Sequence, residues 1–66
     1  MIKILIAEDQ EIISQSLEII INSKADLKVV GVAGDGEKAV RLAKELIPDI
    51  ILMHIRIDRK STRLNS

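Results

Sequence analysis

The stretch that decides the fold is Ile-Lys-Ile-Leu-Ile-Ala-Glu-Asp (residues 2–9), an apolar run that ends in two carboxylates. It is too short to span a membrane and is rich in β-branched isoleucine, which predicts a strand buried on both faces. Such strands belong to parallel sheets that are covered by helices. Ligands of open parallel sheets bind at the carboxyl ends of the strands, where Glu8 and Asp9 stand. These two acids are therefore the first candidate site residues.

Two amphipathic helices and two further strands are predicted along the chain. Apolar residues recur at spacings of three and four in each helix, which places them on one face. The predicted elements are helices at residues 10–23 and 37–47 and strands at residues 27–33 and 49–55. Pro48 ends the second helix, because the residue before a proline avoids helical backbone angles. Asp9 and Asp35 are the predicted N-caps, and Met53 is predicted to lie in the core.

The order strand-helix-strand-helix-strand with short connections predicts parallel strands joined by right-handed crossovers. If the first strand lies between the other two, the helices cover opposite faces, which gives an α/β doubly wound sheet with strand order 2-1-3. The carboxyl ends of the first and third strands then meet. We expect Asp9 and His54 to face each other there. Gly31 predicts a close approach of another backbone segment to the second strand.

Composition and charge exclude several classes of function. The chain has 66 residues, no cysteine, no aromatic residue and one histidine, so we expect neither a disulfide, a structural zinc site nor a base-stacking platform. Residues 1–57 hold seven basic and nine acidic residues, a net charge of −2, which argues against nucleic-acid binding by this segment. No signal peptide or membrane span is visible, and a cytoplasmic location is expected.

Three stretches together resemble the receiver domain of two-component response regulators, above all receivers that precede a helix-turn-helix transcriptional output. They are the acid pair Glu8-Asp9, residues 33–39 (Ala-Gly-Asp-Gly-Glu-Lys-Ala) and residues 48–53 (Pro-Asp-Ile-Ile-Leu-Met). The resemblance covers residues 1–57 and implies the N-terminal half of a flavodoxin-like, five-stranded domain. It also implies a module that is not an enzyme, with a histidine kinase as partner and a DNA-binding output domain outside this segment.

The resemblance further implies a magnesium site. In that family the acid pair and an aspartate at the end of the third strand hold Mg²⁺, and that aspartate accepts a phosphoryl group. The implied ligands here are Glu8, Asp9 and the main-chain carbonyl of Arg56, while His54 falls on the phospho-acceptor position. Because imidazole is a poor ligand for a hard cation, we expect the magnesium site to be weakened or lost and aspartyl phosphorylation to be absent.

Other interpretations of these residues stay open at this point. Three interpretations of His54 stay open. It is a polar residue at a strand end with no chemical role, or it belongs to a pseudo-receiver that acts as a phosphorylation-independent protein-interaction module. In the third, it results from a single-base change in an aspartate codon. Glu8 and Asp9 have a structural interpretation as well, because acids beside a helix N-terminus stabilise the helix dipole. A five-stranded family fold also implies an uncovered edge at residues 49–55, and hence partial unfolding or self-association of this segment.

Residues 58–66, Asp-Arg-Lys-Ser-Thr-Arg-Leu-Asn-Ser, do not resemble the family. They match the conceptual translation of a common short-read sequencing adapter, so we expect them to be an assembly artefact. The competing interpretations are a natural disordered basic extension and a nucleic-acid arm, and the three basic residues supply little phosphate contact.

The adapter hypothesis predicts the encoding DNA of this tail. Residues 58–66 should be encoded by GAT CGG AAG AGC ACA CGT CTG AAC TCC. Reading the DNA across codons 54 to 66 checks both the tail and the histidine codon, and other codons in the tail would contradict the hypothesis.

Overall fold

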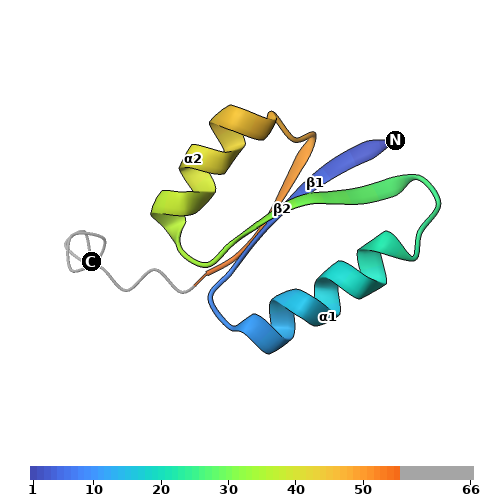
Figure 1. The fold of residues 1–66 in the computed structure, drawn as a ribbon, viewed down its shortest axis with the longest axis horizontal. Coiled ribbons are helices and arrows are strands. Elements are labelled where there is room, and N and C mark those ends of the chain that lie inside the picture. The colour runs from blue at the N-terminus through green and yellow to red at the C-terminus, as the bar shows by residue number, and fades with distance from the viewer. Residues whose placement is uncertain (56–66) are drawn as a thin grey trace, which may run out of the picture.

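The computed structural model describes residues 1–55 as three strands and two helices (Figure 1). The elements are β1 (Ile2–Glu8), α1 (Glu11–Asn22), β2 (Leu27–Ala33), α2 (Gly36–Leu46) and β3 (Ile50–His54). Their bounds agree with the predicted elements to within one residue at each end. The predictions for Arg56 and for residues 58–66 lie outside the described residues.

The three strands form one parallel sheet in the order β2-β1-β3. Figure 1 shows α1 and α2 on opposite sides of this sheet. The predicted doubly wound order 2-1-3 is therefore confirmed. β1 is the central strand, and its side chains from Ile4 to Ala7 are all apolar. They are at most 6% exposed, because both faces of this strand are covered.

The space beside Gly31 is filled by side chains, whereas a close backbone approach was predicted. A Cβ atom at this position would lie 2.8 Å from Leu46 Cδ1 of α2 and 3.2 Å from Leu5 Cδ1 of β1. Both distances are shorter than ordinary van der Waals contact. The missing side chain of Gly31 thus lets α2 pack closely on the sheet.

One helix cap was predicted correctly and the other was wrong. Asp35 caps α2, where its carboxylate accepts a hydrogen bond of 2.7 Å from the Lys38 N–H. The N-cap position of α1 is Gln10 rather than Asp9, and no side chain caps that helix. The Gln10 N–H itself donates to the carboxylate of Glu8, two residues earlier, at the end of β1.

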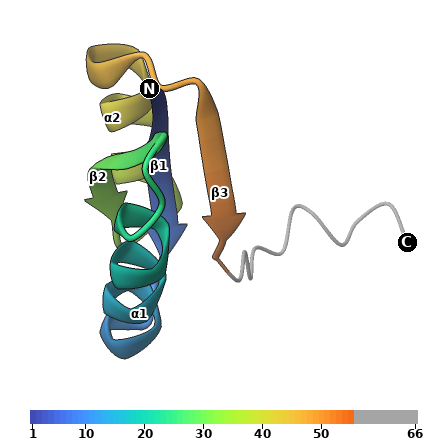
Figure 2. The same ribbon diagram turned by 90° about the vertical axis from the view of Figure 1, so that its right-hand side faces the viewer.

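β3 is apolar on both faces, but the prediction that Met53 is a core residue was wrong. The apolar residues of the strand, Ile50, Ile51, Leu52 and Met53, are 37 to 55% exposed. The reason is that both helices pack mainly on β1 and β2, and Figure 2 shows β3 at the side of the sheet. Within residues 1–55, no strand pairs with the outer edge of β3.

Neither helix in the described part of the chain has the length and apolarity needed to cross a membrane.

The exposed edge of β3 predicts self-association of the 66-residue chain, because unpaired backbone groups beside apolar side chains invite pairing with another chain. Ile50→Lys places a charge on this strand and should shift the chain toward monomer. Sedimentation velocity at increasing protein concentration measures the shift. Ile19→Lys is the matched control, since Ile19 lies on α1 and is 71% exposed. Equal association of the two variants would contradict a role for the β3 edge.

Candidate functional site

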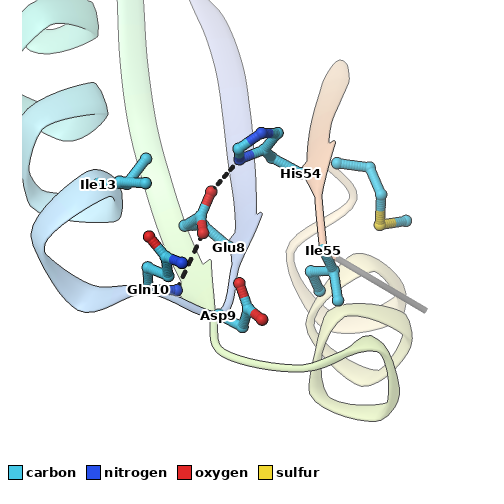
Figure 3. A pocket seen from close by; sticks show the side chains of 7 residues that line it. Glu8, Asp9, Gln10, Ile13, His54 and Ile55 are labelled. Atoms are coloured by element: carbon cyan, nitrogen blue, oxygen red, sulfur yellow. Dashed lines mark hydrogen bonds and ion pairs between the residues drawn. The ribbon is translucent and has the colours of Figure 1, made fainter. Parts of the chain in front are cut away.

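The candidate site is a pocket at the carboxyl end of the sheet, where β1 and β3 end beside each other (Figure 3). The pocket has a volume of about 310 Å³. Its lining residues are Glu8, Asp9, Gln10, Ile13, Met53, His54 and Ile55. Two carboxylates and one imidazole therefore share the place that open parallel sheets use for ligands.

The strand register brings His54 to Glu8. β1 and β3 are paired from Ile4 with Ile50 to Glu8 with His54. Residues at matched positions of neighbouring strands project to the same face of a sheet. The side chain of His54 is 67% exposed, whereas that of Glu8 is 1% exposed. The pair thus joins a buried carboxylate to a ring that faces solvent.

Both carboxylate oxygens of Glu8 have partners in the protein. Nδ1 of His54 contacts Oε1, and the Gln10 N–H donates to Oε2 at 2.9 Å. An ionised carboxylate only accepts hydrogen bonds, so Nδ1 carries the proton of this contact. The His54 hydrogen bond and then the Gln10 N–H hold the pKa of the Glu8 carboxyl below its ordinary value of 4.5, while burial opposes them by raising the pKa.

Asp9 and His54 line the same pocket, as predicted, but Glu8 and not Asp9 makes the contact with the imidazole. Asp9 follows the end of β1 and is exposed. In Figure 3 its carboxylate stands apart from the contact between Glu8 and His54. Glu8 is the last residue of β1 and is paired with His54, whereas Asp9 lies past the end of the strand, so Glu8 is the acid that reaches the imidazole.

The residues of the pocket fit Mg²⁺ poorly. Mg²⁺ requires near-octahedral oxygen ligands, yet both Glu8 oxygens are bonded to protein N–H groups and His54 offers nitrogen. Asp9 is left as the one carboxylate available to an ion. Over the described range 1–55, no three His, Asp or Glu side chains gather closely enough to hold a metal ion. The third expected ligand, the carbonyl of Arg56, lies outside that range.

Comparison with known proteins identifies the family. Residues 4–61 match the model of the response regulator receiver domain. The chain belongs to this family. The match runs past residue 57, and the proposed boundary between a receiver segment and a tail at that residue stays a prediction.

Receivers of several kinds of protein are similar to this one. The transcriptional regulatory proteins LiaR and LnrK of Bacillus subtilis are 42% and 44% identical to it over 83% and 86% of the chain. A protein-glutamate methylesterase/protein-glutamine glutaminase of Thermotoga maritima is 45% identical over 85% of the chain. The crystal structure of the response regulator domain of Thermotoga maritima CheB is 43% identical, with a TM-score of 0.83 over 88% of the chain.

The receiver segment spans only part of each of these proteins. It covers 26% of LiaR and of LnrK, 16% of the methylesterase and 43% of the CheB domain chain. The flavodoxin-like fold of the CheB receiver agrees with the observed sheet order and with the fold predicted from sequence.

Sequence reasoning missed one contributor to the receiver site. The backbone N–H of Gln10 donates to Glu8. The identity of residue 10 does not predict this hydrogen bond, because every residue except proline has a backbone N–H.

The lowered pKa of Glu8 predicts a pH-dependent stability. Its contribution to the free energy of unfolding is complete above the ordinary pKa of 4.5 and is lost as the pH falls through the lower folded pKa. The difference in unfolding free energy between the wild type and Glu8→Gln should therefore shrink as the pH falls below 4.5. Urea unfolding followed by circular dichroism, at pH values from neutral to acidic, measures it.

Glu45→Gln, a change of an exposed carboxylate on α2, is the matched control. A Glu8→Gln difference that stays constant over the same pH range would contradict the assigned contact.

Proposed function

We propose that this chain is the N-terminal half of a receiver domain from a two-component response regulator, and that it takes no phosphoryl group on an aspartate. The observation that carries the proposal is the register of β1 and β3, which places residue 54 beside the acid pair. In the family that position holds the phospho-acceptor aspartate. Here it holds His54, whose Nδ1 is engaged by Glu8, so the carboxylate that would accept the phosphoryl group is missing.

The proposed partner is a histidine kinase, and the proposed output is a DNA-binding domain elsewhere in a longer protein. Two of the similar proteins are transcriptional regulatory proteins, and the chain covers only 26% of each. That proportion leaves ample length for an output domain. The segment itself is proposed to be neither an enzyme nor a nucleic-acid binder, and the net charge of −2 over residues 1–57 supports the second point.

A second candidate function is a pseudo-receiver that docks a protein partner without phosphorylation. One specific observation favours it. Glu8 is buried and each of its oxygens accepts a hydrogen bond within the protein, so the buried carboxylate has its partners without a phosphoryl group.

Phosphoryl transfer from acetyl phosphate tests the first proposal. The chain is extended with the C-terminal part of a similar receiver such as that of LiaR, and incubated with acetyl phosphate and Mg²⁺. We expect no aspartyl phosphate on the wild type and uptake on His54→Asp, because a carboxylate is then restored at the acceptor position. Intact-mass spectrometry detects the adduct.

His54→Asn is the matched control, since it has the shape of aspartate without the nucleophilic carboxylate, and it should stay unmodified. Failure of His54→Asp to take up phosphate would count against descent from a signalling receiver. An aspartyl phosphate on the wild type would refute the proposed loss of acceptance.

A further inference from the structure

We propose that the side chain of His54 takes the place of the divalent cation in this receiver, and that its bond to Glu8 keeps Mg²⁺ out of the pocket. The inference rests on the proposed function, which makes this pocket the receiver site. It goes further by assigning an active blocking role to His54. On the simpler alternative, position 54 only lacks a ligand and the remaining acids are free to bind an ion.

The first argument is that the carboxylate of Glu8 is closed off from an entering ion. Its side chain is 1% exposed, and its two oxygens accept from Nδ1 of His54 and from the Gln10 N–H. The remaining lone pairs of these oxygens are buried with the side chain, so an entering cation reaches them only by displacing one of the two donors. Displacing the Gln10 N–H would remove the partner of a backbone donor at the start of α1, and displacing His54 would break the side-chain link between β1 and β3.

The second argument is electrostatic. Glu8 and Asp9 are adjacent carboxylates in one pocket, and such a pair favours a positively polarised group nearby. Among residues 1–55, no lysine or arginine lines the pocket. His54 directs its ring N–H at the buried member of the pair. This hydrogen bond places positive partial charge beside the two carboxylates, which a bound cation would otherwise provide.

A different metal is the main competing outcome. Imidazole together with carboxylates suits Zn²⁺ better than Mg²⁺. However, Nδ1 of His54 is turned to Glu8 and not to a shared centre with Asp9, and residues 1–55 contain no group of three side chains placed to hold a metal. We therefore expect no Zn²⁺ site that depends on His54.

Isothermal titration calorimetry of the 66-residue chain with Mg²⁺ tests the proposal. We expect no saturable binding to the wild type and gained binding to His54→Ala, because removal of the imidazole frees one oxygen of Glu8 beside Asp9. His54→Asp should bind more tightly still, since it adds a third carboxylate. His54→Gln is the matched control. Its side-chain amide can still donate a hydrogen bond to Glu8, so this variant should show no saturable Mg²⁺ binding.

One further readout keeps the result interpretable. The amide resonance of Gln10 in a ¹H–¹⁵N spectrum reports whether each variant is folded and whether its N–H still bonds to Glu8. If His54→Ala is unfolded, the comparison is made between His54→Gln and His54→Asp, and binding to both or to neither overturns the proposal.

Three outcomes overturn the blocking role. They are saturable Mg²⁺ binding to the wild type, a folded His54→Ala that binds no Mg²⁺ although His54→Asp does, and Zn²⁺ binding to the wild type that is lost in His54→Ala. These results are distinct from a failure of the proposed function, which is decided by phosphoryl uptake and not by ion binding.

Discussion

The contact between Glu8 and His54 is the interaction on which the site depends. It joins residues that are 46 positions apart in the sequence and links the ends of the central strand and its neighbour. Because Glu8 is buried, its charge must be compensated within the protein. The imidazole and the Gln10 N–H provide that compensation, and the same two groups leave the carboxylate without a free oxygen. Structure and chemistry at this end of the sheet are therefore determined together.

The contact is held in place by a small core directly behind it. Ala7, Ala33 and Ala39 form a buried cluster, against which Leu42 and Ile55 pack. Small side chains allow β1, β2 and α2 to approach closely at the end of the sheet where the pocket lies. Side chains in a densely packed core have little freedom to shift, so the position of Glu8 at the end of β1 is well defined.

Fold and chemistry are separable in this receiver. The backbone superposes on the CheB receiver with a TM-score of 0.83, although histidine stands at the position that we propose as the former acceptor site. The side chain of His54 is 67% exposed, so exchanging it changes little of the packing that specifies the sheet. The same position lies beside the acid pair, and a change there alters the chemistry directly. Function resides in the site and not in the fold that carries it.

The sequence by itself determined the type and order of the elements and the Asp35 cap, because local periodicity and backbone restrictions specify these features. Only the tertiary structure decided that Glu8 rather than Asp9 meets His54, that Gln10 completes the site, and that Met53 lies outside the core. These features depend on strand register and on how far the helices extend over the sheet. Long-range pairing sets both, and no local pattern of residues records it.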